Sequence, residues 1–305
     1  MRLDRQIRAL RPDLSWTRIR ELIARGQASV NGHIERDEAL EVDEADAISI
    51  DPSRPALPHA RLDLTRLYED AEILVIDKPA GLLTIASDVS RRDSEDTVLA
   101  RAQKYARHLH GRRGYAGVLH RIDRDTSGAL ALALTREAHT AGRELFAAHR
   151  FERHYLAIVD GVPADDSGTI DAPVSRDYDD GRRRLVREAV DGRRAVTHFR
   201  VRERFARAAL VELELETGRQ HQIRLHMEHL GHPLVGEKVY ANTGASGASA
   251  VRRQMLHAWR LAFPHPLRRG VIQVEAPLPE DFERLLAKLR RVQPRTETRR
   301  RNPLR

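Results

Sequence analysis

Hydrophobic residues recur with different periods along the chain, and the change of period outlines its organisation. Near the N-terminus, LDRQIRAL has apolar residues at helical spacing, and Ser15 can cap a second helix in WTRIRELIARG. The next segment, ASVNGHIE, places Asn31 and Gly32 between two short apolar runs, which indicates a tight hairpin. Residues 1–52 therefore predict a small domain of two helices followed by a β-ribbon.

Strand patterns dominate the remainder of the chain. Residues 53–66 are interpreted as a linker because the region is proline-rich and has no clear periodicity. Beyond it, strands are predicted in EILVIDKP, GALALALT, HYLAIVDG, AVTHFRV, ALVELELETG and GVIQVEAP. Helices are predicted in REAHTAGRELFAAH, QHQIRLHMEHLG and PEDFERLLAKLRR. The predicted fold class over 67–291 is α+β, with a mixed, mainly antiparallel sheet and flanking helices.

Charge and composition narrow the function classes. Lys and Arg number 53 against 45 Asp and Glu, and the net charge of +8 favours a polyanionic partner, nucleic acid above all. The absence of cysteine excludes disulfide scaffolds, thiolate zinc sites and thiol catalysis. No signal peptide or membrane span is recognised, so a cytoplasmic protein without a membrane partner is expected. Residues 244–250 are expected to form a mobile loop, and residues 292–305 a basic disordered tail.

The segment HRIDRDTSG is rich in chemically useful side chains. Asp123 and Asp125 alternate with Arg121 and Arg124 directly before an apolar strand. Guanidinium neighbours favour the ionised carboxylate, which is the form that a nucleophile needs. From the residues alone, a loop in which Asp and Arg pair for structural reasons stays open as the alternative.

A second rich segment, TGRQHQIRLH, joins a tight turn to a helix. Arg219 in the turn and His221 at the start of the helix could hold a phosphate or a carboxylate. His221 and His226 are five residues apart, which does not place two imidazoles on one helical face. Without cysteine or a nearby acidic ligand, no metal site is predicted, and these histidines are interpreted as core or surface residues.

The N-terminal 52 residues resemble an S4 RNA-binding module. The resemblance rests on RLDRQI, SWTRIRELIARGQASVNG and the closing DAISI. It implies that the second helix and the following turn face the RNA backbone, with Arg18, Arg20 and Arg25 as binding residues. From composition alone, the alternative of an ordinary basic helix exposed to solvent remains, since runs of charged residues often lie on solvent-exposed faces. Further basic segments expected to contact RNA are RHLHGRR, GRRRLVR and the C-terminal tail.

Almost the whole chain resembles the RluA-type pseudouridine synthase family, in the branch with an N-terminal S4 domain that modifies large ribosomal RNA. The resemblance is carried by DKPAGLLT, HRIDRDTSG, HYLAIVDG, GRQHQIRLH, GHPLVGEKVY and QMLHAWRLAFPHP, in that order. Ile122 replaces a leucine of the family pattern, and Gln220 replaces its usual threonine. In the first segment, Lys78 and Pro79 are interpreted as a strand end before a turn, with Gly81 freeing the backbone.

The resemblance implies a mechanism and its residues. Asp123 is implied as the catalytic aspartate, Tyr155 as the active-site tyrosine, Arg224 as the basic partner of the aspartate, and Arg121 as a contact to RNA or the displaced base. Uridine isomerisation breaks the C1′–N1 bond, rotates the uracil and joins C1′ to C5, so no cofactor is needed. A covalent adduct and a glycal route both stay open.

Two alternatives from other classes are retained. One is a non-catalytic S4-type RNA-binding or ribosome-assembly factor, in which the large domain is a scaffold. The other is a nucleoside or glycoside hydrolase that uses Asp123 and Asp125 as its carboxylate pair. For the synthase, the expected partner is ribosomal RNA, with transfer RNA as the second candidate, and the expected state is a monomer.

Overall fold

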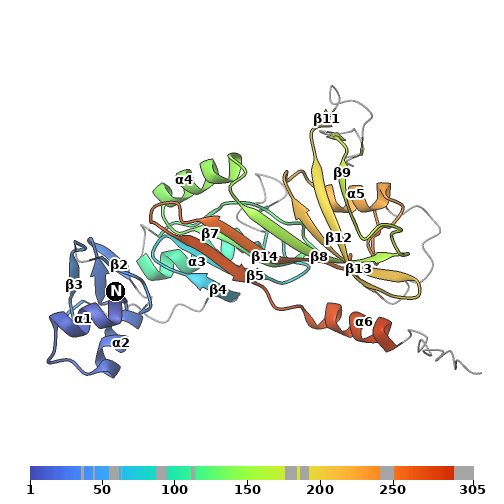
Figure 1. The fold of residues 1–305 in the computed structure, drawn as a ribbon. Coiled ribbons are helices and arrows are strands. Elements are labelled where there is room, and N and C mark those ends of the chain that lie inside the picture. Colours follow the sequence, from blue (N-terminus) through green and yellow to red (C-terminus); the bar gives the residue numbers. More distant parts are fainter. Residues whose placement is uncertain are drawn as a thin grey trace, which may run out of the picture. The chain divides into compact units, whose positions relative to one another are not determined.

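The chain divides into two compact units (Figure 1). The first comprises Met1–Glu152 and Arg260–Ala276, and the second Arg153–Trp259 and Pro277–Arg305. The computed structural model describes residues 1–35, 38–43, 45–54, 62, 64–86, 95–110, 114–175, 184–185, 192–240 and 251–291. The predicted loop 244–250 and tail 292–305 lie outside these ranges. The division runs through the predicted synthase domain, and the domain boundaries drawn from the sequence stay predictions.

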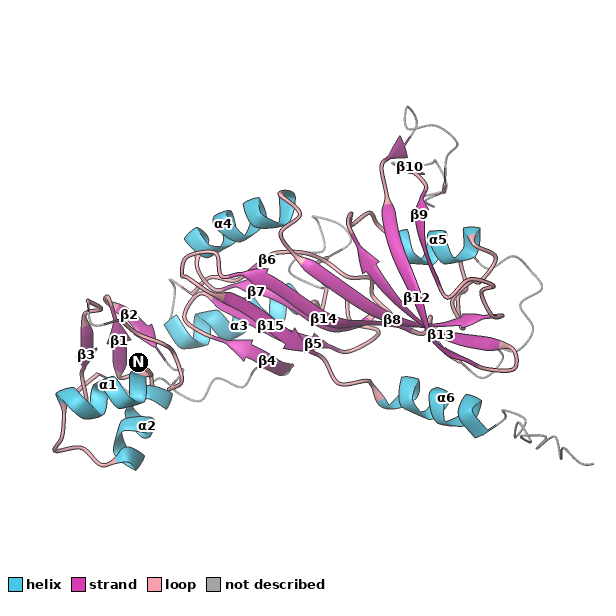
Figure 2. Ribbon diagram, in the orientation of Figure 1, coloured by secondary structure: helices cyan, strands magenta, loops and turns pink. Residues whose placement is uncertain are grey.

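The first unit begins with a module of two helices and a three-stranded sheet (Figure 2). The helices are α1 (Leu3–Leu10) and α2 (Trp16–Ala24), and the strand order is β2 (His33–Glu35), β1 (Ala28–Val30), β3 (Ile48–Ile50). The Ser15 hydroxyl accepts a hydrogen bond from the Arg18 N–H and caps α2 as predicted. Asn31 and Gly32 have φ angles of 52° and 80°, which form the predicted tight hairpin.

The same unit contains a larger antiparallel sheet. Its strands run in the order β4 (Thr65–Glu69), β5 (Ile73–Lys78), β7 (Ser127–Ala133), β14 (Leu256–Pro264), and β14 belongs to this unit from Arg260 onward. The short strand β6 (Gly117–Val118) pairs with β7, and β15 (Val271–Glu275) pairs with β14. Each strand pair in this unit whose register is described is antiparallel, which confirms the predicted fold class.

Helices cover both faces of strands β5 and β7 (Figure 1). Leu74 and Leu130 belong to the cluster under α3 (Val98–His110), and Val75 and Ala131 to the cluster that includes Ala138 of α4 (Arg136–Ala147). Alternate residues of each strand thus reach opposite clusters, as the two-residue period of a strand requires. All seven residues of β7 are buried, so the segment that follows HRIDRDTSG is fixed in a packed core.

The second unit is also built on antiparallel strands. Its strands run in the order β8 (Glu152–Asp160), β13 (Ala208–Leu215), β12 (Val196–Arg204), β9 (Ser167–Asp171), and β10 (Val174–Ser175) pairs with β11 (Gly192–Arg193). Helix α6 (Glu280–Arg291) packs Phe282 and Leu286 into a cluster with Leu156 and Leu210. Helix α5 (Gln222–His229) places Leu225 beside Val174 and Ala195. No helix in the ranges given above is long and apolar enough to cross a membrane.

A buried cluster of charges lies where β2 meets the β4–β5 turn. Arg268 forms ion pairs with Glu35 at 3.1 Å and with Glu72. Nearby, the His265 Nε2 donates to Asp70 at 2.9 Å. Burial raises the pKa of Asp70, but hydrogen bonds from His265 and Tyr68 outweigh it and bring the pKa below its ordinary value. These hydrogen bonds therefore favour the ionised form of Asp70, whereas burial raises the pKa of Glu72.

In the same cluster, the side-chain oxygens of Asp70 and the Nδ1 of His265 already accept hydrogen bonds from protein donors. Ligand atoms of Asp70, Glu72 and His265 lie within 4.8 Å of one another. However, Asp70 Oδ1 accepts from the backbone N–H groups of Glu72 and Ile73, and Oδ2 accepts from Tyr68 and His265. Since His265 Nδ1 accepts the N–H groups of Leu267 and Arg268, these atoms already have protein donors. We interpret the cluster as structural.

Candidate active site

Asp123 lies in a tight turn between β6 and β7. Its backbone carbonyl accepts a hydrogen bond from the Thr126 N–H at 3.2 Å. The side chains of Asp123 and Asp125 are half-buried, whereas Arg121 and Arg124 are exposed. The turn therefore leaves the Asp123 carboxylate within reach of solvent, although the strand that follows it is fully buried.

The fully buried Lys78 fixes the residue after Asp123. Its Nζ donates to the carbonyl oxygens of Pro79, Leu82 and Arg124, each at 2.8 Å. Arg124 O also accepts from the Gly81 N–H at 2.9 Å. Lys78 does end β5, as predicted, but the sequence interpretation missed its role. A lysine at the end of an apolar strand could have indicated this role, because a buried ammonium group requires several hydrogen-bond acceptors from neighbouring segments.

Thr84 fixes the residue before Asp123. Its hydroxyl donates to Ile122 O at 2.8 Å and accepts from the Ile122 N–H at 3.4 Å. The segment DKPAGLLT thus holds the backbone on both sides of the aspartate. This arrangement limits the conformational freedom of the backbone that carries the carboxylate, which helps to position a catalytic group.

His120 anchors the start of the same loop. Its Nε2 accepts from the Ala131 N–H of β7 at 3.1 Å. Its ring stacks on Phe146 at 5.9 Å and meets Phe151 edge-on at 6.0 Å. The histidine of HRIDRDTSG therefore belongs to the core and supports the turn.

In the second unit, Tyr155 is buried in β8 opposite Leu213 of β13. Arg153 lies two residues earlier on the same strand face, and its Nη2 donates to Leu215 O at 3.1 Å. Burial lowers the pKa of Arg153 and the nearby Arg219 lowers it further, whereas Tyr155 acts in the opposite direction. Arg153 is a candidate site residue that sequence reasoning missed, although a charged residue within an apolar strand was a visible signal.

Arg219 extends this positive region. Its Nε donates to Arg194 O at 3.0 Å, which fixes the guanidinium after β13. Burial lowers the pKa of Arg219, and the positive charge of Arg193 adds to the effect. Guanidinium groups gathered in this way favour an anion such as phosphate, because it would relieve their mutual repulsion.

Gln222 shapes the turn that carries Arg219 and His221. Its Oε1 accepts from the Thr217 hydroxyl at 2.8 Å and from the Arg219 N–H at 2.9 Å, and its Nε2 donates to Val196 O at 2.9 Å. His221 has a left-handed φ of 58° at the start of α5, and its Nδ1 lies 2.5 Å from the Tyr240 hydroxyl. The role of Gln222 was not predicted from the sequence, since a single glutamine forms no motif or periodic pattern.

Arg224 is buried on α5 and forms a two-pronged ion pair with Glu237. Its Nε and Nη2 each donate to a Glu237 carboxylate oxygen at 2.7 Å. The guanidinium carbon also lies 5.0 Å from the centroid of the Tyr240 ring. Arg224, Tyr155, Arg219 and His221 belong to the second unit, whereas Asp123 and Arg121 belong to the first. The predicted pairing of Arg224 with Asp123 stays a prediction.

Replacing Glu237 by Gln is expected to destabilise the protein by about 3 kcal/mol, because it removes the carboxylate charge that pairs with the buried Arg224 guanidinium. Urea unfolding measures this loss, and Glu228→Gln, a change on the half-buried end of α5, serves as the control. If Glu237→Gln lost no more unfolding free energy than Glu228→Gln, the ion pair between Arg224 and Glu237 would not stabilise the fold as stated.

The same pair predicts a pH dependence. Burial raises the pKa of Glu237, but the hydrogen bond and charge of Arg224 outweigh it, so the pKa lies below its ordinary value. A depressed carboxyl pKa stabilises the fold above the unfolded pKa of about 4.3, and this stabilisation is lost as the pH falls through the folded pKa. The urea concentration at the unfolding midpoint of the wild type should therefore decrease as the pH is lowered below about 4. The midpoint of Glu237→Gln should decrease less over the same pH range.

His226 is a core residue, as interpreted from the sequence. It is completely buried, with Nδ1 2.9 Å from the Thr197 hydroxyl and Nε2 3.0 Å from Ala172 O. Burial lowers its pKa, which favours the neutral ring. Both nitrogens have partners, so His226 has no lone pair to offer a metal.

The predicted RNA-binding arginines lie on and just after α2. Arg18 and Arg25 pair with Glu21 at 2.8 Å and 2.9 Å, and Arg20 lies 3.4 Å from Glu38. Exposed ion pairs of this kind contribute about 0–1 kcal/mol. Such arginines can therefore exchange their carboxylate partners for phosphates at little cost.

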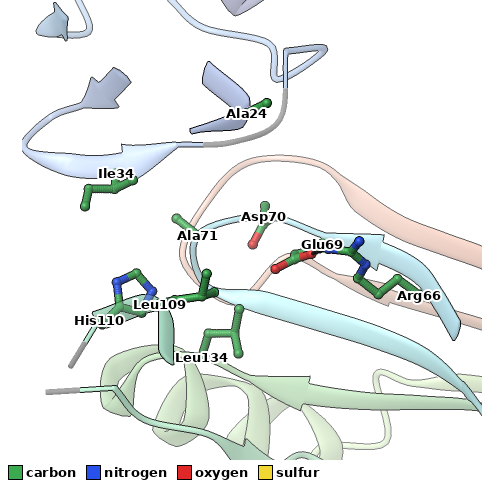
Figure 3. Close-up of a pocket in the computed structure, with 9 residues that line it drawn as sticks. All are labelled: Ala24, Ile34, Arg66, Glu69, Asp70, Ala71, Leu109, His110 and Leu134. Atoms are coloured by element: carbon green, nitrogen blue, oxygen red, sulfur yellow. Dashed lines mark hydrogen bonds and ion pairs between the residues drawn. The ribbon is translucent and has the colours of Figure 1, made fainter. Parts of the chain in front are cut away.

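A cavity of about 240 Å³ lies between this module and the β4–β5 turn (Figure 3). Ala24 and Ile34 face it from the module, and Arg66, Asp70 and their neighbours face it from the other side. None of its lining residues belongs to the predicted site. The cavity is therefore not a candidate for the reaction centre.

Comparison with known proteins adds independent findings. A family model described as RNA pseudouridylate synthase matches residues 72–229. The chain is 38% identical over 302 residues to the ribosomal large subunit pseudouridine synthase D of Xanthomonas campestris, with 95% of this chain and 89% of the relative covered. The enzyme of the same name from Pseudomonas aeruginosa is 37% identical over 303 residues, with 95% and 92% covered.

Among solved structures, the human RNA Pseudouridylate Synthase Domain Containing 4 is similar, with a TM-score of 0.62 and 26% identity. The similarity covers 74% of this chain and 93% of that one. The matched family region includes the segments that carry Asp123, Tyr155 and Arg224.

Proposed function

Because the chain belongs to the RNA pseudouridylate synthase family, as an RluA-type member, we propose that it isomerises specific uridines of large-subunit ribosomal RNA with Asp123 as the nucleophile. Family membership makes it an RNA pseudouridine synthase, an isomerase, and favours this reading over a non-catalytic RNA-binding factor. The names of the relatives support ribosomal RNA as the substrate. Assignment to the S4-containing branch, the monomeric state and a cytoplasmic location belong to the same proposal.

The observation that carries the proposal is the double anchoring of the Asp123 turn. Lys78 and Thr84 hold the backbone on either side, while Asp123 itself is half-buried. A carboxylate held in this way can act at ribose C1′ as the C1′–N1 bond breaks. The uracil then rotates, C5 bonds to C1′, N1 gains a proton, and the C5 hydrogen leaves as a proton. No redox change or external group enters the balance.

We assign supporting roles to the other predicted residues. Tyr155 would stack on the uracil, Arg224 would compensate the Asp123 charge, and Arg121 would contact RNA or the displaced base. Arg219 and His221 would bind RNA phosphate, and the positive charge of Arg193 near Arg219 supports this role. Extruding the target base costs a few kcal/mol, which contacts by Arg18, Arg20 and Arg25 would help to offset.

The proposal is tested with RNA that carries tritium at uracil C5. Release of tritium into water from large-subunit ribosomal RNA, but not from transfer RNA, is the expected result. For each phosphate contact, the logarithm of the RNA-binding constant should fall by about 0.7–0.9 per decade of salt. Release from transfer RNA alone would show that transfer RNA, and not ribosomal RNA, is the substrate. Release from neither RNA would contradict the proposed reaction.

A further inference from the structure

Trp16 presents a large aromatic surface on a rigid base. It is the first residue of α2 and keeps 44% of its surface exposed. The Ser15 cap fixes the start of this helix, and Ile19 and Ile23 on the following turns are buried in the module core. The exposed ring therefore belongs to an ordered helix end.

Positive charge surrounds this ring. Trp16 lines a hollow of about 450 Å³ together with Arg2, Asp4, Arg5 and Arg20. Asp4 is buried and already binds Arg2 through hydrogen bonds of 3.1 Å and 3.2 Å, so its charge is compensated. Arg5 is exposed and has no hydrogen-bond or ion-pair partner within the described ranges. The side chain of Arg20 is 56% exposed.

This combination fits one ligand chemistry. An aromatic face binds the π-face of a nucleobase, and flanking guanidinium groups bind the adjoining phosphates. Paired bases in an RNA duplex have both faces covered by stacking, so only an unpaired nucleotide can present its base to the ring. We propose that Trp16 is a stacking platform for an unpaired base of the RNA substrate, with Arg5 and Arg20 holding its phosphates. This inference rests on the proposed function and adds a base-binding element that is not among the residues assigned to the reaction.

The composition of the chain provides a direct readout. It contains two tryptophans, Trp16 and Trp259, so Trp259→Phe leaves Trp16 as the sole indole in the full-length protein. The expected result is saturable quenching of its fluorescence by a short single-stranded RNA. The same strand annealed to its complement should quench much less. Equal quenching by the duplex, or RNA binding without quenching, would overturn the proposal.

Substitutions in the full chain separate stacking from charge. Trp16→Leu should weaken single-strand binding, measured by fluorescence anisotropy of a labelled RNA, about 5- to 150-fold, whereas Trp16→Tyr should retain most affinity. The matched control is Leu10→Ala, because Leu10 is another exposed apolar side chain of the module. An equal effect of Leu10→Ala would show that Trp16→Leu acts through general damage and would oppose the proposal.

Arg5→Gln should reduce the salt slope of single-strand binding by about one phosphate contact. Arg11→Gln is the control, because Arg11 pairs with Asp13 and does not line the hollow. An unchanged slope for Arg5→Gln would remove Arg5 from the proposed site.

The outcomes distinguish this site from the proposed reaction. Quenching by single strands without tritium release would refute the reaction and leave the platform standing. Tritium release by a protein whose Trp16 fluorescence stays unquenched would support the reaction and refute the stacking platform. Quenching by an acidic, aromatic peptide but not by RNA would assign the hollow to a protein partner and refute the proposal.

Discussion

Replacing Asp123 by Asn is expected to lower the rate of pseudouridine formation by about 10⁴-fold or more, because the amide has no charge with which to act at C1′. The turn should persist, since Lys78 and Thr84 hold its backbone and not this side chain. Single-turnover tritium release measures the effect. RNA affinity and the far-UV spectrum should be unchanged.

Asp125→Asn is the matched control for this substitution. Asp125 is a second half-buried carboxylate of the same turn, two residues away. Its substitution should leave the rate within a few-fold of the wild type. Equal tritium release by the Asp123→Asn variant and the wild type would remove Asp123 from the reaction, and loss in the Asp125 variant alone would transfer the role.

Replacing Lys78 by Met should cause the second-largest loss. The change keeps an unbranched side chain one atom shorter and removes three charge-assisted hydrogen bonds, including the bond to Arg124 O beside the aspartate. A displacement of about 1 Å at a catalytic group can cost about 100-fold in rate. We therefore expect kcat to fall about 100-fold with little change in KM, measured by tritium release at a temperature where the variant is folded.

Loss of fold would also lower the apparent kcat at unchanged KM, so the folded fraction is measured beside the rate. Partial unfolding would reduce the active fraction, which the urea-unfolding curve of the same sample reports. Lys104→Met, on the exposed face of α3, is the control and should retain full activity. A folded Lys78→Met variant with wild-type kcat would show that the buried lysine does not position Asp123.

Local patterns predicted most of the elements because those signals lie within a few residues. The hairpin at Asn31 and Gly32, the Ser15 cap and the apolar run of β7 each depend on near neighbours. Helix α3 was not among the predicted elements, although its buried residues Val98, Ala102, Tyr105 and Leu109 follow helical spacing. The helical periodicity of these apolar residues was present, but the charged residues between them made it hard to recognise.

The side-chain partnerships could not be predicted in this way. Glu237 is thirteen residues from Arg224, and Lys78 reaches a carbonyl forty-six residues away. Such contacts depend on how the turns approach one another, and the turns carry no period. Charges buried within apolar segments, such as Lys78 and Arg153, were the accessible hint, because a buried charge needs partners.

The central claim is that this chain moves uracil from an N-glycosidic to a C-glycosidic bond within one RNA strand. Chromatography coupled to mass spectrometry of the nucleosides from treated RNA tests it most directly, because uridine and pseudouridine have the same mass and must first be separated. The account predicts pseudouridine in amounts equal to the tritium released, with the total mass of unlabelled RNA unchanged. Free uracil together with abasic ribose would contradict it and would indicate a hydrolase.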